Sequence, residues 1–163
     1  MSCSQAEYLC LAAVMALAPA TATDRATDSV ALPAVVFVCE HGSAKSMIAM
    51  AYFDRLAKKH GLKLRATARG IAPDPVLAPA AEKGLQRDGF DTSTFLPGRL
   101  SEKDVEGAAR IVTFGCSLPD AKSAAGKITD WQNVPAVSED YSKARDEIVK
   151  RVEKLIADLG AGK

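Results

Sequence analysis

From residue 33 onward, apolar runs alternate with segments of helical periodicity. Residues 34–38 (AVVFV) form a continuous, β-branched apolar run, which is typical of a strand buried on both faces. Similar runs predict strands over residues 62–68, 110–114 and 127–131. Helices are predicted over residues 46–60 and 77–88, each followed by a glycine suited to a C-cap. This alternation predicts βαβ units and therefore a parallel sheet.

Two further helices are predicted from their caps and their apolar faces. Ser101, followed by Asp104 three positions later, is typical of a helix N-terminus. The last helix is expected to be capped by Ser138, with Glu139 and Asp140 in its first turn. Its apolar positions recur with a period near 3.6 and predict a core-facing stripe, which consists of Tyr141, Ala144, Ile148, Val152, Leu155 and Leu159.

The first thirty residues have a different pattern. Residues 8–18 are apolar, and Pro19 and the small triplet Ala20-Thr21-Ala22 follow, which matches the apolar region and cleavage site of a secretory signal. The basic segment that normally precedes such a region is missing. The alternatives are an N-terminal helix of the fold or a true start at Met15.

These observations give an expected domain organisation. We expect a signal peptide over residues 1–22, a linker over 23–32 and one domain over 33–160. The location that follows is periplasmic or secreted, with a cytoplasmic protein as the alternative. A chain of 163 residues with 48% hydrophobic and 25% charged positions suits one globular domain.

Charge and cysteine usage exclude several classes of function. A net charge of +1 provides no general field for nucleic acid or anionic lipid, so anion binding must be local. The sequence contains no run of 18 apolar residues, so it does not predict a membrane-spanning helix. The four cysteines lack paired spacing, and His41 and His60 add no ligand set, so neither a metal nor a cofactor is expected. The oligomeric state is left open.

The segment between the first strand and the first helix carries the candidate chemistry. It reads Cys39-Glu40-His41-Gly42-Ser43-Ala44-Lys45-Ser46. A turn of this length can direct successive backbone amides at one point, to which the following helix also presents its positive end. A cysteine at the strand end is then favoured as a thiolate, and Lys45 can place its cation over a bound oxyanion. The small residues of the loop allow close backbone approach.

At these residues the chain resembles a known family. VFVCEHGSAKS is similar to the phosphate-binding loop of low-molecular-weight protein tyrosine phosphatases and of the thioredoxin-coupled arsenate reductases that share their fold. The resemblance extends more weakly over residues 34–160. It implies an α/β fold: a four-stranded parallel sheet with helices on both faces.

The resemblance also implies roles for individual residues. Cys39 matches the nucleophile, and Ser46 matches the hydroxyl that bonds the thiolate. The backbone of residues 40–45 matches the oxyanion cradle: Glu40, His41, Gly42, Ser43, Ala44 and Lys45. Within that cradle the acidic side chain of Glu40 is expected to face away from the anion. The side chain of His41 either adds a second cation or points to solvent, and we favour solvent.

Two positions depart from the family pattern. Lys45 stands where the family has an arginine, and an ammonium acts as a point charge where a guanidinium forms two parallel hydrogen bonds. Val134, before Pro135, stands where the family has its catalytic aspartate, and valine cannot protonate a leaving group. Asp130 and Asp140 are the alternatives considered for the missing acid.

Two residues outside the loop are further candidates. Arg69 ends the second predicted strand, where it could supply the missing guanidinium or simply lie on the surface. Cys116 lies within one position of the resolving cysteine of the arsenate reductases, although Ser123 replaces their third cysteine. It is either a redox partner of Cys39 or a small buried residue.

Three functions follow from this pattern. The favoured one is a cysteine-dependent phosphatase that forms a phosphocysteine intermediate, with a phosphate ester as substrate. An arsenate reductase that uses Cys39 with Cys116 or a small thiol is the alternative. A non-catalytic module that binds a tetrahedral oxyanion is the third. The loop is kept, while Lys45 replaces the family's arginine and Val134 replaces its catalytic aspartate.

Overall fold

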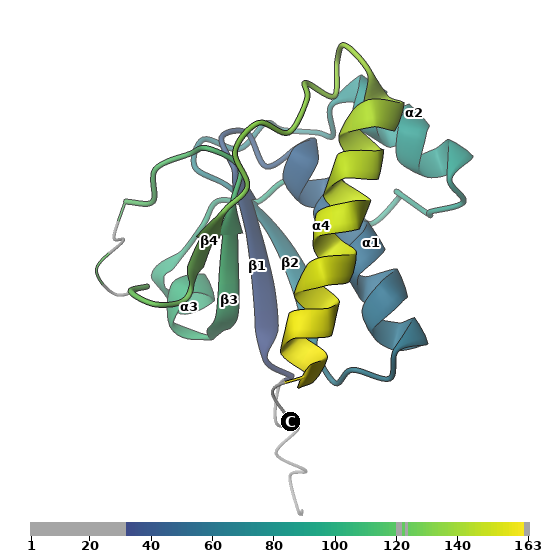
Figure 1. The fold of residues 1–163 in the computed structure, drawn as a ribbon. Helices are drawn as coiled ribbons and strands as arrows, with labels where there is room; N and C mark the ends of the chain where they lie inside the picture. The colour runs from purple at the N-terminus through teal and green to yellow at the C-terminus, as the bar shows by residue number, and fades with distance from the viewer. Residues whose placement is uncertain (1–31, 120–121, 123, 162–163) are drawn as a thin grey trace, which may run out of the picture. The chain divides into compact units, whose positions relative to one another are not determined.

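Four parallel strands form the centre of the molecule (Figure 1). The computed structural model describes residues 32–119, 122 and 124–161. The strands are β1 (Ala34–Cys39), β2 (Arg65–Gly70), β3 (Ala108–Thr113) and β4 (Ile128–Asp130), in the order β2-β1-β3-β4. The predicted four-stranded parallel sheet is confirmed. The chain passes from β1 to β2 on one side and then to β3 on the other side of β1. The carboxyl end of β1 therefore lies where the strand order reverses, the usual position of a ligand site in a parallel sheet.

Helices cover both faces of the sheet, as predicted. They are α1 (Lys45–Lys59), α2 (Pro79–Arg87), α3 (Glu102–Glu106) and α4 (Tyr141–Ala161). On one face α1 and α4 pack against each other and against the sheet, around Phe37, Phe53 and Ile148. On the other face Val105 of α3 packs with Val36 and other buried residues of β1 and β3.

Complete burial of β1 explains its uninterrupted apolar sequence. All six of its residues are buried, with alternate side chains facing the two layers. The apolar stripe predicted for α4 is also correct: five of its six positions are buried, and Leu159 packs at the edge of the same core. The predicted cap at Ser101 is present, since its hydroxyl accepts from the Asp104 amide.

Several predicted boundaries were wrong by a few residues. The second strand begins at Arg65, not residue 62, and α2 begins at Pro79, not residue 77. The last helix begins at Tyr141, and its cap is Asp140 instead of Ser138. The Asp140 carboxylate accepts from the Lys143 amide at 3.0 Å. For β2 and α2, apolar residues continue the pattern beyond the regular hydrogen bonding.

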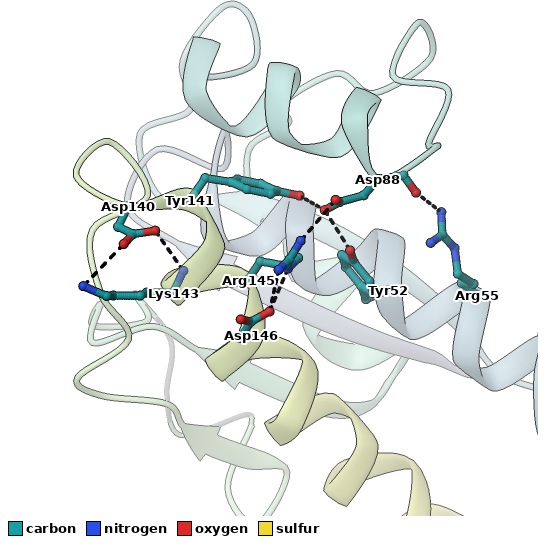
Figure 2. A network of polar contacts seen from close by, with 8 residues as sticks. All are labelled: Tyr52, Arg55, Asp88, Asp140, Tyr141, Lys143, Arg145 and Asp146. Carbon is teal, nitrogen blue, oxygen red and sulfur yellow. Dashed lines mark hydrogen bonds and ion pairs between the residues drawn. The ribbon is translucent and has the colours of Figure 1, made fainter.

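A partly buried polar cluster joins three helices on the α1–α4 face (Figure 2). Asp88, at the C-terminal end of α2, accepts hydrogen bonds from Tyr52 of α1 at 2.8 Å and from Tyr141 of α4. The guanidinium of Arg145 lies 3.1 Å from the other carboxylate oxygen. The ring of Tyr141 also fills the space beside Gly84, where any Cβ would overlap it. We call these residues the Asp88 junction: Asp88, Tyr52, Tyr141, Arg145 and Gly84.

Electrostatics of the junction favour the ionised form of Asp88. Burial acts to raise the pKa of Asp88, but the hydroxyls of Tyr141 and Tyr52 and the Arg145 guanidinium outweigh it, and the pKa is lowered. Burial and the hydrogen bond to Asp88 raise the pKa of Tyr52 to about 12. The two phenols therefore remain donors throughout the physiological range.

The predicted signal peptide (residues 1–22) and most of the predicted linker (23–32) lie outside the described residues. Among the helices that are described, none is long and apolar enough to cross a membrane.

Candidate active site

In the loop after β1, backbone carbonyls have hydrogen-bond partners within the protein, whereas the backbone amides have none in the part of the chain that the structure describes. The carbonyl oxygens of Cys39, Glu40, His41 and Ser43 each accept a hydrogen bond from an amide of the segment between β2 and α2, at Ile71, Ala72, Asp74 and Ala78 respectively. Within the described part of the chain, no amide of residues 40–45 donates to another protein group. Four carbonyls of this segment are thus paired, while six amides near the N-terminus of α1 have no protein acceptor among the described residues. Free amides in this position are typical of anion sites.

Two glycines allow the loop to lie against β2. Gly42 has a φ of 64°, a conformation that glycine adopts at little cost. A Cβ at Gly42 would lie 2.8 Å from the amide nitrogen of Gly70, and a Cβ at Gly70 would lie 2.8 Å from that of Gly42. The close contact of the two backbones therefore depends on glycine at both positions.

The candidate nucleophile and its expected hydroxyl partner lie together. Cys39 is the last residue of β1, and its Sγ lies 3.2 Å from Oγ of Ser46, in the first turn of α1. Both residues are buried, and neither cysteine of the described chain is in a disulfide. The sulfur therefore lies beneath the loop amides and at the positive end of a 15-residue helix.

Lys45 is directed to an unexpected partner. Its Nζ donates to the carbonyl oxygen of Val134 at 2.7 Å. Asn133, which precedes Val134, has a φ of 62°, in the left-handed region that asparagine tolerates better than most residues. The cation thus ties the start of α1 to the segment after β4, where the resemblance placed an aspartate.

Asp74 is a site residue that sequence reasoning missed. Its carboxylate accepts a hydrogen bond from the Ser43 hydroxyl, and Oδ1 lies 3.6 Å from Nδ1 of His41. No local pattern singles it out, because the contacts join residues more than thirty positions apart. The one available signal is the Pro-Asp-Pro sequence, which indicates a turn directly after β2.

A cavity of about 580 Å³ opens beside Cys39. Its polar wall includes His41, Lys45 and Asp74, and Glu40 lines it while remaining exposed. The rest of the wall consists mainly of small apolar residues from α2 and from the segment before α4, with one aromatic ring: Ala44, Ala78, Pro79, Ala80, Phe114, Ala136 and Val137. The cavity could hold the organic part of an ester whose anionic group lies on the loop.

The structure contradicts the prediction that Arg69 faces the bound anion. Its Nε donates to the Asp104 carboxylate at 2.9 Å, and a terminal nitrogen donates to the Ala68 carbonyl. Arg69 pairs with Val38 in the sheet, on the face covered by α3, and does not line the cavity. Its guanidinium joins β2 to α3 instead.

The two aspartates considered as substitute acids are also engaged elsewhere. The Asp130 carboxylate accepts from the Thr113 hydroxyl at 2.7 Å and from the Gly115 amide at 2.8 Å. Burial opposes ionisation of Asp130, but these hydrogen bonds outweigh it and lower its pKa. Asp140 caps α4, and neither residue lines the cavity.

Cys116 lies in the loop after β3, near the end of β1, but does not line the cavity beside Cys39. Its Sγ contacts the carbonyl oxygen of Val38 at 3.4 Å, and it packs against the apolar layer beneath α3. Burial raises the pKa of the Cys116 thiol. Its redox role remains a prediction.

Known proteins share this arrangement of sheet and loop. The structure superimposes on YfkJ from Bacillus subtilis with a TM-score of 0.69, at 22% identity, covering 81% of this chain and 97% of that one. An arsenate reductase in a phosphate-binding state gives a TM-score of 0.65, at 22% identity over 77% of this chain and 97% of that one.

Sequence comparison gives the same grouping. A Halobacterium salinarum protein named "Putative arsenate reductase" is 22% identical over 125 residues, which cover 76% of this chain and 87% of that protein. The model of the family described as low molecular weight phosphotyrosine protein phosphatase matches residues 34–115, from β1 through the loop and on past β3. With the strand, loop and helix that carry Cys39 all inside that match, the chain belongs to the low molecular weight phosphotyrosine protein phosphatase family.

Proposed function

We propose that this protein is a cysteine-dependent phosphatase that hydrolyses phosphoric monoesters through a phosphocysteine intermediate. The observation that carries the proposal is the position of Cys39 Sγ, 3.2 Å from the Ser46 hydroxyl and beneath a loop whose amides have no protein acceptor in the described chain. Such a loop suits the three non-bridging oxygens of a phosphoryl group.

Each part of the site has a role in the first step. The Cys39 thiolate attacks phosphorus, the S–P bond forms and the bond to the ester oxygen breaks. A hydrogen bond from Ser46 and the N-terminus of α1 stabilise the thiolate before attack. The loop amides hold the phosphoryl oxygens, and Lys45 adds positive charge at the cavity wall. Water then attacks phosphorus and releases inorganic phosphate and the thiolate.

Hydrolysis of p-nitrophenyl phosphate tests this proposal. The protein should release p-nitrophenol, and acid quenching during turnover should trap phosphate on the Cys39 peptide. Cys39→Ser should reduce turnover by at least about 10³-fold, the scale of losing a covalent nucleophile. Cys116→Ser is the matched control and should keep most of the activity. Turnover that survives Cys39→Ser would reject the mechanism.

Arsenate reduction is a second candidate, favoured by the contact between Lys45 and Val134. The Val134 carbonyl accepts a hydrogen bond from Lys45 at the position where the phosphatases have an acid. Arsenate has no alkoxide leaving group, so its reduction does not need that acid. In that reaction Cys39 would displace water from arsenate, and a second thiol would attack the Cys39 sulfur. A disulfide would form as As(V) leaves as As(III). Arsenite production with dithiothreitol as the thiol, measured beside phosphatase turnover, separates the two activities.

A further inference from the structure

Hydrolysis of an ester with a poor leaving group requires a proton at the departing oxygen. Val134 cannot supply one, and Asp130 and Asp140 are held away from the cavity. We propose that His41 is the general acid of this site and that Asp74 is its positioning residue. This inference rests on the proposed phosphatase function and deepens it.

Asp74 bonds the backbone of His41, and its carboxylate lies close to the imidazole. The Asp74 amide donates to the His41 carbonyl at 3.0 Å, and Oδ1 lies 3.6 Å from His41 Nδ1. The other carboxylate oxygen accepts from the Ser43 hydroxyl, and Ser43 is only 2% exposed. The carboxylate is thus anchored to a buried part of the loop and sets the position of the imidazole.

His41 and Asp74 line the same cavity as Cys39 and Lys45. Because Nδ1 faces Asp74, Nε2 is the ring nitrogen left to exchange a proton with an ester bound in the cavity. The side chain is 63% exposed, so it can also exchange protons with water. The remaining titratable group on the cavity wall is Glu40, which is exposed and has no comparable anchor among the described residues.

The geometry favours the imidazole over Asp74 as the acid. Both carboxylate oxygens of Asp74 face other groups, Ser43 and His41, so this carboxylate is placed to orient the imidazole and not to meet the ester oxygen itself. A similar division of roles, with a carboxylate orienting a histidine that moves the proton, occurs on unrelated folds.

The two steps balance with one proton cycling through His41. In the first step the Cys39 thiolate forms the S–P bond, the P–O bond breaks, and the His41 imidazolium gives its proton to the leaving oxygen. The product is an alcohol and a neutral imidazole. In the second step the imidazole takes a proton from water, the resulting hydroxide attacks phosphorus and the S–P bond breaks. Inorganic phosphate leaves, and thiolate and imidazolium are restored.

The dependence of kcat/KM on leaving-group pKa tests this assignment. Wild type, His41→Asn, Asp74→Asn and the control His60→Asn are compared on p-nitrophenyl phosphate and phenyl phosphate. His41→Asn should lose about 10²-fold more activity on phenyl phosphate than on p-nitrophenyl phosphate, because a good leaving group needs little protonation. Asp74→Asn should show a smaller change in the same direction. His60, at the far end of α1, should match wild type.

Two results would overturn the inference while leaving the phosphatase intact. One is an equal loss on both esters in His41→Asn, which would indicate a role in loop shape alone. The other is a selective loss on phenyl phosphate in Asp74→Asn but not in His41→Asn, which would make Asp74 the acid. Absence of p-nitrophenyl phosphate hydrolysis by wild type would instead reject the proposed function itself, and the inference with it.

Discussion

The Asp88 junction and the Cys39 loop are both polar clusters at the ends of secondary-structure elements, yet their groups are satisfied in opposite ways. At the junction, both carboxylate oxygens of Asp88 have protein donors, from two hydroxyls and a guanidinium. At the loop, the carbonyls are paired, but no amide of residues 40–45 has a protein acceptor in the described chain. The junction is complete by itself, whereas the loop amides are free for the anion that the proposed function assigns to them.

This difference separates a structural cluster from a functional one. A fully paired buried network rigidifies the fold, because each lost partner leaves an unsatisfied group. Uncommitted donors at a helix N-terminus lower the stability of the empty protein slightly and are stabilised when a ligand binds. The charged residues alone do not reveal this difference, because each region contains an acid beside a base: Asp88 with Arg145 at the junction, and Asp74 with His41 at the loop.

The largest expected effect comes from the loop backbone. Gly42→Ala places a Cβ 2.8 Å from the Gly70 nitrogen. It should lower the free energy of unfolding by about 3 kcal/mol or more and should also weaken phosphate binding. Gly61→Ala is the matched control, since its φ of 67° carries the same strain but its Cβ meets no atom within 4 Å. Urea unfolding and competitive inhibition by phosphate measure both effects. Equal costs for the two variants would show that the contact with Gly70 is unimportant.

The junction should be the next most sensitive region, and in stability more than in activity. Asp88→Ala leaves the hydroxyls of Tyr52 and Tyr141 without their acceptor and removes one of the two carboxylate partners of Arg145, so the free energy of unfolding should fall by about 2 kcal/mol. Asp158→Ala, which removes an exposed partner of Lys154, should cost no more than about 0.5 kcal/mol. A similar loss in both would indicate that the junction contributes no more than a surface ion pair.

The contribution of Asp88 should also depend on pH. Its pKa is lower in the folded protein than in the unfolded chain, so its ionisation stabilises the fold above the unfolded value, near 4, and this stabilisation is lost as the pH falls through the folded value. The difference in unfolding free energy between wild type and Asp88→Asn should therefore be constant from pH 7 to about 5 and shrink below about 4. A difference that stays constant down to pH 2.5 would contradict this account.

A smaller effect is expected where the loop cation meets Val134. Lys45→Arg should raise turnover of p-nitrophenyl phosphate by about tenfold, because a guanidinium can bond two phosphoryl oxygens. The change keeps the charge. Lower turnover would show that the loop is shaped around lysine and its hydrogen bond to the Val134 carbonyl.

The smallest effect should come from Arg69. Because its guanidinium is paired with Asp104 on the α3 side, Arg69→Ala should leave inhibition by phosphate unchanged and cost about 1 kcal/mol of stability. Lys45→Ala, measured in parallel, should weaken that inhibition. Weaker phosphate binding in Arg69→Ala would restore the original prediction for this residue.

The features that were predicted correctly from the sequence depend on residues close together in the chain. The buried run of β1, the stripe of α4 and the Ser101 cap each depend on residues within one element. The contact between Cys39 and Ser46 was expected from the family resemblance, which also rests on one continuous stretch of strand, turn and helix start.

The errors concern residues whose neighbours are set by tertiary structure. Arg69 was expected at the site because it lies at the correct end of β2. Its register opposite Val38, however, places it on the α3 side, whereas Gly70 is the residue opposite Cys39. Asp74 and Asp88 were missed because their partners lie 31 to 57 positions away in the chain.

The contact between Gly42 and Gly70 also makes anion binding a reporter of folding. The loop lies against a second strand, β2, which follows α1 in the chain, so a peptide of residues 34–50 should have no anion site. Phosphate then binds the native state alone and shifts the unfolding equilibrium by mass action. At a hundredfold excess over its dissociation constant it should add about 2.7 kcal/mol, and the midpoint of thermal unfolding should rise with phosphate concentration.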